Sequence, residues 1–299
     1  MSLAIQTLGL TRLFPGGHGV ADLDLAVPAG AIFGFLGPNG AGKTTTIRLL
    51  LGLLRPQRGE VVLHGYPLRT QARPALARVG ALVESPALYP HLTGRQNLEV
   101  TRRLLGTPRV RIDEVLAIVG MRESADRSVR DYSLGMRQRL AIALAMLDRP
   151  KLLILDEPGN GLDPAGILDM RQLLRSLAAD HDMTVFVSSH QLGEVELVAS
   201  HVGVLREGAL QFQGTIGELR ARNAPRVLLR AHDPVRATHV LSNAGESVNA
   251  IDAETLAVAL GGRDEAQLNR LLLESGVEVT HLMREQPSLE SLFFRIAHA

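Results

Sequence analysis

The chain has 299 residues, 45% of them hydrophobic, so it can bury one large core or two unequal ones. Its 32 basic and 31 acidic residues nearly cancel and only 3% of residues are aromatic, which argues against nucleic acid as a partner. The absence of cysteine excludes disulfides, thiol catalysis and cysteine metal sites, as is common in cytoplasmic proteins.

The first 30 residues are predicted to form short strands around a turn at 15–19, where three glycines and a proline gather. The segment that follows, 20–27, alternates between apolar and polar residues, as a half-buried strand does. An apolar run at 31–36 is then short enough for a buried strand, and the residues from 46 onward read as the first turns of a helix.

A glycine-rich loop joins that strand to that helix. It fits the pattern of a glycine, four free positions and then Gly-Lys-Thr. The glycines let backbone N–H groups point at phosphate oxygens, and the helix N-terminus adds partial positive charge at the same point. The alternative is a turn without a ligand. We expect a nucleotide phosphate site formed by Gly37, Pro38, Asn39, Gly40, Ala41, Gly42, Lys43, Thr44 and Thr45.

Lys43 stands out because only two of the 32 basic residues are lysines. A compact ammonium fits between phosphates where a guanidinium fork would not, so Lys43 is expected to reach the terminal phosphates. The Thr44 hydroxyl is expected to hold Mg²⁺. Phe14, before the first turn, either stacks on the nucleobase or packs in the core, and Val20 is expected to line the nucleotide.

A further strand is predicted at 59–65, and the pattern is helical and arginine-rich from 92 to 147, with a break near 106–108. The arginines are typical of a solvated helical face. Within this region, Ser133 and Gly135 open a helix that runs to Met146. Ser133 is either a simple N-cap or part of a second anion site, and the first phosphate loop favours the anion site.

Two more buried strands are predicted to end in polar residues. The run at 151–158 leads into Asp156 and Glu157, and the run at 183–190 ends at His190, with a helix over 164–180 between them. Strands that alternate with helices predict an α/β fold with a mostly parallel, doubly wound sheet, whose ligands bind at the strand C-terminal ends.

These three side chains have the chemistry of phosphoryl transfer to water. We expect Asp156 to hold Mg²⁺ through a water, and Glu157 to orient and polarise the attacking water. His190 can hydrogen-bond the γ-phosphate or that water. Taken singly, each residue has an ordinary structural alternative, a turn for the acidic pair and a satisfied polar group for His190.

Composition shifts at 220–225, which we interpret as a linker. A small α/β module is predicted beyond it, without a recognisable catalytic constellation. Its expected elements are strands at 226–232, 254–260 and 277–283, helices at 234–244 and 264–276, and a short final helix.

The ordered set of motifs resembles the nucleotide-binding subunit of ABC transporters. Residues 37–45 resemble the family's Walker A motif, 152–157 its Walker B motif with the catalytic glutamate, 133–138 its signature motif and 161–163 its D-loop, while His190 resembles the switch histidine. The resemblance covers about residues 1–220 and implies a P-loop NTPase domain there, with a helical subdomain at about 86–150. The small α/β module beyond the linker is then expected to be an accessory domain at 224–299.

The resemblance also implies the cofactors and partners. ATP and Mg²⁺ would be sandwiched in a head-to-tail dimer, formed by two copies of this chain or by this chain and a related one. Closure and reopening of that dimer would drive separately encoded membrane permease subunits. The residues that would contact the partner's ATP are Ser133, Gly135, Met136 and Asp163.

Two departures from the family pattern matter. The signature usually reads Leu-Ser-Gly-Gly-Gln, whereas residues 132–136 here read Tyr-Ser-Leu-Gly-Met. Where the family usually has a glutamine ligand to Mg²⁺ and water, this chain has Glu84, which cannot donate as an amide does and adds negative charge beside ATP. We therefore expect slower or differently coupled hydrolysis.

These two departures, together with the Pro-Ser-Leu-Glu run at 287–290, resemble the sequences of the ABC type-two exporter branch, which includes drug, bacitracin and lantibiotic resistance systems. The implied function is an ATPase subunit of such an exporter, docked on its permease through residues 85–90. No apolar run is long enough to span a membrane, so the expected location is the cytoplasmic face of the cell membrane through the permease. The alternatives are a soluble ABC ATPase acting on ribosomes or DNA, and an ATP-binding regulator without catalysis.

Overall fold

The computed structural model describes residues 2–84, 87–221, 226–260 and 262–285. Its contacts divide the chain into two units, one that extends to Ile216 and one that begins at Gly217. Among the described residues, no helix combines the length and the apolar character needed to cross a bilayer.

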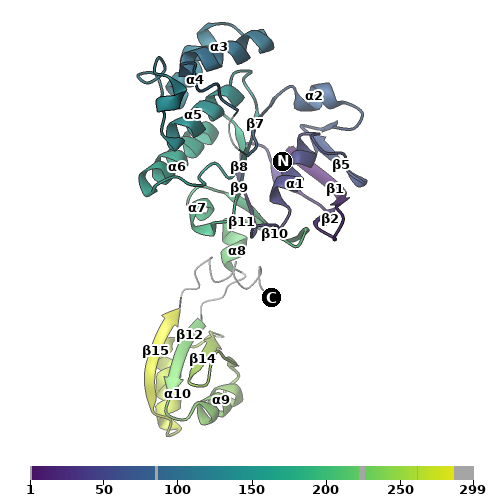
Figure 1. Cartoon of the computed structure of the whole chain (residues 1–299). Helices are drawn as coiled ribbons and strands as arrows, with labels where there is room; N and C mark the ends of the chain where they lie inside the picture. The colour runs from purple at the N-terminus through teal and green to yellow at the C-terminus, as the bar shows by residue number, and fades with distance from the viewer. Residues whose placement is uncertain (1, 85–86, 222–225, 261, 286–299) are drawn as a thin grey trace. The chain divides into compact units, whose positions relative to one another are not determined.

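A six-stranded sheet with the order β11-β10-β4-β9-β8-β7 forms the centre of the first unit (Figure 1). All neighbouring strands in it are parallel except β10 and β11, which form an antiparallel hairpin. The predicted α/β fold with a mostly parallel sheet is therefore confirmed. The strands are β4 (Ile32–Leu36), β7 (Val79–Leu82), β8 (Leu152–Asp156), β9 (Thr184–Ser189), β10 (His201–Arg206) and β11 (Ala209–Thr215).

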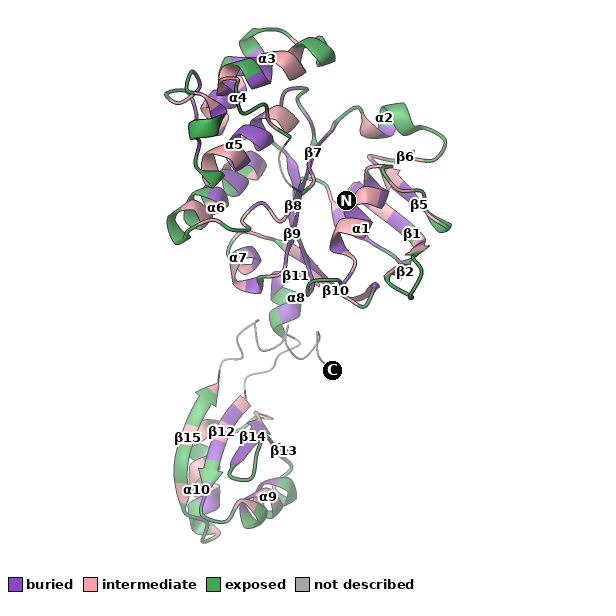
Figure 2. Cartoon of the chain, in the orientation of Figure 1, coloured by how far each residue is buried: buried purple, intermediate pink, exposed green. Residues whose placement is uncertain are grey.

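The central strands are continuous apolar runs because both faces of this sheet are covered. On β8, Leu153 and Leu155 belong to the core beneath the helices, whereas Leu152 and Ile154 belong to a second core on the opposite face. Every residue of β4, β8 and β9 is buried (Figure 2). The strands therefore read as unbroken hydrophobic segments rather than as alternating ones.

An antiparallel sheet completes the second core. Its order is β2-β1-β5-β6, and β3 pairs with β1. Helix α1 contributes Ile47, Leu49 and Leu50 to the same core, which buries α1 together with residues of both sheets. The strands of this sheet are β1 (Leu3–Leu13), β2 (Gly19–Leu23), β3 (Ala26–Pro28), β5 (Arg58–Leu63) and β6 (Tyr66–Pro67).

Helices α5 and α6 pack on the other face of the central sheet, and α3 and α4 pack on α5 (Figure 1). The predicted break near 106–108 is present, because α3 ends at Leu105, the next residue Gly106 has a left-handed φ of 71°, and α4 begins at Val110. The helices of the first unit are α1 (Lys43–Leu50), α2 (Ala72–Leu76), α3 (Gly94–Leu105), α4 (Val110–Ile118), the 3₁₀ turn η1 (Val129–Asp131), α5 (Leu134–Ala145), α6 (Pro164–Ala179) and α7 (Leu192–Glu196).

Two features near the end of the first unit differ from the prediction. Strands β10 and β11 were not predicted, and they are joined by Glu207 and Gly208, which have φ of 48° and 80° as a two-residue hairpin with a primed turn requires. Helix α8 (Ile216–Ala221) includes the first two residues of the predicted linker, whose other residues lie outside the described part of the chain.

The second unit has the order β12-α9-β13-β14-α10-β15, the split βαβ arrangement of ferredoxin-like modules. Its antiparallel sheet has the order β13-β14-β12-β15. Strand β13 was not predicted because it is a mostly exposed edge strand, and the predicted final helix lies outside the described residues. The elements are β12 (Arg226–Ala231), α9 (Pro234–Asn243), β13 (Ser247–Ala250), β14 (Thr255–Ala259), α10 (Glu265–Glu274) and β15 (Val279–Glu285).

Candidate functional site

The loop between β4 and α1 requires glycine at defined positions. Gly40 and Gly42 have φ of 81° and 106°, in the left-handed region that other residues avoid. A Cβ on Gly42 would lie 2.8 Å from the carbonyl oxygen of Gly19 and from Cγ1 of Val20. The glycines thus allow a tight loop, hereafter the phosphate loop (residues 37–45), to end at the first turn of α1, where N–H groups have no intrahelical acceptor.

Lys43 is buried inside this loop, with only 5% of its surface exposed. Its Nζ donates to the carbonyl oxygens of Gly37 (2.8 Å) and Pro38 (3.2 Å) and forms an ion pair with Oε1 of Glu157 (3.2 Å). The ammonium therefore lies where the loop, the end of β8 and the start of α1 meet.

A cavity opens beside the loop. Phe14 lines it and is 37% exposed, with the Arg12 guanidinium 5.2 Å from its ring centroid, so Phe14 is not a core residue. Val20 and Ala41 belong to the core instead, and Val20 packs beneath Gly42 rather than lining the cavity. His18 was not singled out from the sequence. The other residues that line the cavity are Gly19, Asn39, Gly40, Gly42, Lys43, Thr44, Thr45 and Glu157.

The ends of β8 and β9 form a hydrogen-bonded group, because the parallel register pairs Asp156 with Ser188. The Ser188 hydroxyl donates to Oδ1 of Asp156 at 2.6 Å and accepts from the backbone N–H of Glu157 at 2.9 Å. Glu157 itself has a φ of 47°, which is uncommon outside glycine and directs the chain away from the strand. Ser188 is thus a positioning residue that the sequence did not indicate.

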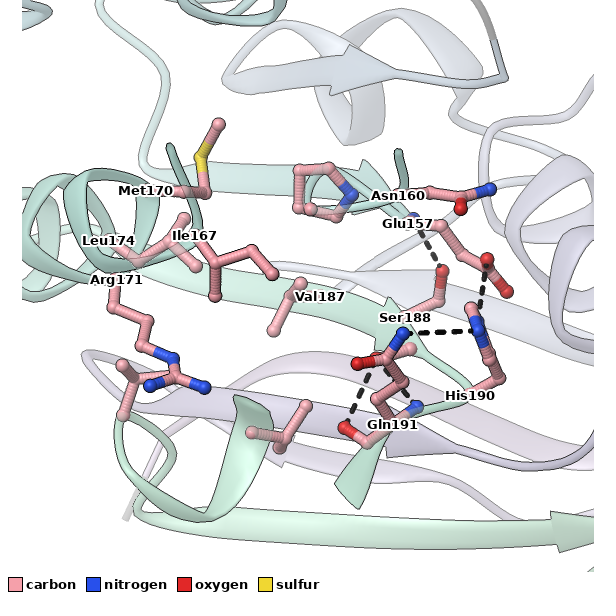
Figure 3. Close-up of a pocket in the computed structure, with 15 residues that line it drawn as sticks. Glu157, Asn160, Ile167, Met170, Arg171, Leu174, Val187, Ser188, His190 and Gln191 are labelled. Carbon is pink, nitrogen blue, oxygen red and sulfur yellow. Dashed lines mark hydrogen bonds and ion pairs between the residues drawn. The ribbon is translucent and has the colours of Figure 1, made fainter. Parts of the chain in front are cut away.

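His190 completes a chain of contacts that begins at Lys43. Its Nδ1 lies 3.0 Å from Oε2 of Glu157, and its Nε2 lies 3.5 Å from Nε2 of Gln191 (Figure 3). The carboxylate can only accept, so Nδ1 of His190 donates in this contact. Glu157 thereby bridges Lys43 and His190.

Behind this pair lies the small cavity drawn in Figure 3. Its volume of about 30 Å³ admits one or two waters and excludes a nucleotide. Arg171 of α6 lines it and donates to the carbonyl oxygen of Gly193 in α7 at 3.4 Å. Most of its other lining residues are apolar, among them Ile167, Met170, Leu174 and Val187.

The three predicted Mg²⁺ ligands share a larger cavity of about 350 Å³, hereafter the cation cavity, which is also lined by Leu134, Gln138, Glu157 and Asn160. Thr44, Glu84 and Asp156 are a hydroxyl and two carboxylates, the hard ligands that Mg²⁺ prefers. Glu84 has a φ of 58°, is 59% exposed and pairs with Arg48. No cluster of three His, Cys, Asp or Glu occurs among the described residues, but Mg²⁺ takes one or two carboxylates and keeps its waters, so this donor set fits it.

The remaining predicted residues cap two helices. The Ser133 hydroxyl accepts from the N–H of Met136 at 3.3 Å, and Oδ1 of Asp163 accepts from the N–H of Gly166 at 2.9 Å. Together with Gly135 they line a cavity between α5 and α6, hereafter the signature cavity, which is separate from the one beside the phosphate loop. Within one chain, the structure therefore does not bring Ser133, Gly135, Met136 or Asp163 to the phosphate loop.

Comparisons with known proteins agree with this geometry. The sequence profile of the family described as "ABC transporter" matches residues 20–160. The chain is 39% identical to the bacitracin transport ATP-binding protein BcrA of Bacillus licheniformis, over 99% of this chain and 98% of that protein. It is 35% identical to the daunorubicin/doxorubicin resistance ATP-binding protein DrrA of Streptomyces peucetius, over 98% of this chain and 92% of that protein.

Solved structures of ABC transporter proteins are also similar to this chain. The structure of cbiO1 from Clostridium perfringens, described as part of the ABC transporter complex cbiONQ, superposes with a TM-score of 0.68 and 26% identity. The superposition covers 75% of this chain and 92% of that protein.

Proposed function

This chain belongs to the ATP-binding subunits of ABC transporters, and from that premise we propose that it powers an exporter of antibiotic- or drug-like molecules through a separate membrane permease. It is an ATPase of this family. The observation that carries the proposal is the continuous contact from Lys43 through Glu157 to His190, at the ends of neighbouring strands. Relatives named for bacitracin transport and for drug resistance match almost the whole chain and support the cargo class.

ATP would bind with its phosphates on the phosphate loop. The N–H groups of the loop and of the first turn of α1 would donate to phosphate oxygens, and the Lys43 ammonium would contact the terminal phosphates. Phe14, exposed at the rim of the cavity, would stack on the base. Thr44, Asp156 and Glu84 would hold Mg²⁺, which neutralises phosphate charge during transfer.

Glu157 would orient the attacking water and His190 would hydrogen-bond the γ-phosphate. Both roles need the resting contacts to change, because one carboxylate oxygen of Glu157 faces Lys43 and the other faces His190. Phosphate oxygens would replace Glu157 as the partner of Lys43 and leave its Oε1 free to accept from water. We infer that the resting site becomes competent only when the triphosphate separates Lys43 from Glu157.

The signature cavity supports a head-to-tail dimer. Ser133 and Gly135 lie at the start of a 12-residue helix, a position where N–H groups and a hydroxyl face outward toward an anion. Because they do not reach the phosphate loop of their own chain, a second subunit would present its nucleotide to them. The partner is either another copy or a related chain.

None of the helices among the described residues can cross a membrane. A separate permease would therefore bring the chain to the membrane. We propose that the chain is peripheral on the cytoplasmic face and docks through residues 85–90. Residues 85–86 lie outside the described part of the chain, and Tyr89 in the same segment is 51% exposed. An exposed aromatic side chain suits a protein contact.

The test is phosphate release from MgATP by the wild type and by Glu157→Gln, with size-exclusion chromatography in the presence of ATP. We expect wild type to hydrolyse ATP and the variant to be at least about 100-fold slower, since it loses a general base. The variant should still bind ATP and should form an ATP-dependent dimer. Glu123→Gln, an exposed glutamate on the same unit, is the matched control and should behave as wild type.

Other outcomes would overturn parts of the proposal. Wild-type activity in Glu157→Gln would remove Glu157 from catalysis. A variant that binds ATP but stays monomeric would contradict the dimer, and failure of both proteins to bind ATP would contradict the nucleotide site itself.

A further inference from the structure

Gln138 is a buried polar residue that none of the expected roles uses. It lies in the second turn of α5, and only 6% of its surface is exposed. Its side-chain Oε1 is fully buried and has no hydrogen-bond partner among the residues that the structure describes. A buried acceptor without a partner costs about 1–3 kcal/mol, and it calls for a functional or structural reason.

The surroundings of Gln138 indicate that reason. The residue lines the cation cavity together with Thr44, Asp156 and Glu84, the three proposed Mg²⁺ ligands. Leu134, one helical turn earlier and on the same face of α5, lines that cavity too. The first two turns of α5 therefore form one wall of the cation cavity, and Gln138 is the polar side chain on that wall.

The chemistry of the site leaves a role for a neutral acceptor. Mg²⁺ keeps several of its waters, and each bound water needs acceptors for its protons. Asp156 already accepts from Ser188, and Glu84 pairs with Arg48. A further carboxylate would add negative charge beside the triphosphate, whereas an amide oxygen accepts without adding charge.

We propose that Gln138 is a positioning residue of the cation site, whose side chain turns when MgATP binds so that its amide oxygen, buried in the resting site, accepts a hydrogen bond from a water bound to the divalent cation. The inference rests on the proposed function, because it assumes that MgATP binds at the phosphate loop. Gln138 then orients the waters on the side of the cavity that faces α5. Ser133 caps the same helix, so α5 carries both the signature motif and the side chain that orients the cation-bound waters.

The experiment compares Gln138→Leu, which keeps the size and removes the acceptor, with Gln138→Glu, which keeps an acceptor oxygen. Both are made in the Glu157→Gln background so that ATP is not consumed. Mn²⁺ affinity is measured by electron paramagnetic resonance with ATP bound, and ATP affinity is measured separately in EDTA. Gln211→Leu, an exposed glutamine on β11, is the matched control.

We expect Gln138→Leu to weaken Mn²⁺ binding about tenfold or more, the usual effect of removing a partner of a ligand shell. Its ATP affinity in EDTA should be unchanged, and its melting temperature should be unchanged or higher, because an unpaired buried acceptor is removed. Gln138→Glu should retain Mn²⁺ binding within about threefold, and Gln211→Leu should match its parent.

Wild-type Mn²⁺ affinity in Gln138→Leu would overturn the inference. Equal losses of Mn²⁺ affinity, metal-free ATP affinity and melting temperature would assign Gln138 a purely structural role and would overturn it as well. If the Glu157→Gln parent itself bound neither ATP nor Mn²⁺, the proposed function would fail first, and the two failures are thereby distinguished.

Discussion

The phosphate loop and the signature cavity are held in place in different ways. Strands β4, β8 and β9 and helix α1 converge on the phosphate loop, and Lys43 contacts both the loop and Glu157 across the sheet. In the signature cavity, the side chains of Ser133 and Asp163 accept hydrogen bonds from N–H groups three residues further along their own helices. The phosphate loop is therefore held by contacts between distant segments, whereas the signature cavity is lined by the N-termini of two helices, α5 and α6.

This difference indicates how a site can be divided between subunits. A phosphate cradle must be rigid to place donors, so it is buried and strained, with left-handed residues and close backbone contacts. A surface that closes on another molecule needs open helix ends and small residues instead. Substitutions should therefore separate folding from catalysis at the signature cavity but not at the phosphate loop.

The largest effect is expected from Gly42→Ala. The new Cβ would meet backbone at 2.8 Å, and the φ of 106° is strained for any side chain. We expect loss of ATP binding and a fall in unfolding free energy of more than about 2 kcal/mol. Urea unfolding and ATP titration measure both, and a stable variant that binds ATP normally would contradict the description of the loop.

Gly135→Ala, in the signature cavity, should separate folding stability from hydrolysis. The added Cβ would lie 3.7 Å from Leu162, an ordinary contact, and alanine favours a helix over glycine by about 1 kcal/mol. We expect unchanged or higher stability and unchanged ATP binding by the monomer, but at least roughly tenfold slower hydrolysis because the partner's nucleotide approaches this face. Hydrolysis at the wild-type rate would argue against the role of Gly135 in a dimer.

Glu84→Gln tests the cavity that lies between the two regions. The substitution removes a negative charge beside the phosphates and restores an amide, so we expect basal hydrolysis to rise by roughly two- to tenfold. Phosphate release is the measurement. Arg48→Ala is the control, since it removes the partner of Glu84 and keeps the carboxylate. An equal rise in the control would assign the effect to the broken ion pair.

The smallest effect concerns Tyr132, the residue before Ser133. Burial raises the pKa of its hydroxyl, which donates to the carbonyl oxygen of Ser124 at 2.6 Å. Because the folded-state pKa is raised, its stabilising contribution is complete below the unfolded pKa of about 10 and is lost as pH rises through the folded pKa. The stability lost at high pH is expected to come from the region around the signature cavity and not from the phosphate loop.

Urea unfolding of wild type and Tyr132→Phe at pH 8 and at pH 11 measures this contribution. The variant should be about 1 kcal/mol less stable at pH 8, and the difference should shrink at pH 11. Tyr66→Phe, at an exposed tyrosine, is the control. A difference that stays constant between the two pH values would contradict the assignment.

Several elements were predictable because their signals are local. The buried strands β4, β8 and β9 and the helix α6 lie within one or two residues of the expected ranges, whereas α1 begins at Lys43, three residues before the expected start. Strands β10 and β13 were harder to recognise. Strand β10 begins with His201 and ends with Arg206, and β13 is mostly exposed, so their sequences lack the long apolar run that marks the central strands.

The roles of the site residues remain predictions, but their placement shows where sequence reasoning ends. Val20 was expected at the nucleotide and Phe14 either there or in the core, yet Phe14 lines the cavity beside the phosphate loop and Val20 packs beneath Gly42. His18 lines the cavity beside the phosphate loop although no motif includes it, and Gln138 lines the cation cavity although the signature segment 133–138 gave it no role there. Whether a side chain lines a cavity or packs in the core depends on neighbours that are distant in the chain.

The sequence by itself determined the phosphate loop, the acidic pair at 156–157 and the histidine after the last buried strand, because each depends on short segments with strong local constraints. Only the tertiary structure decided that β8 and β9 pair so that Ser188 contacts Asp156, and that Glu157 lies between Lys43 and His190. The physical reason is the order of strands in the parallel sheet, which joins segments from about thirty to more than a hundred residues apart and which no local pattern encodes.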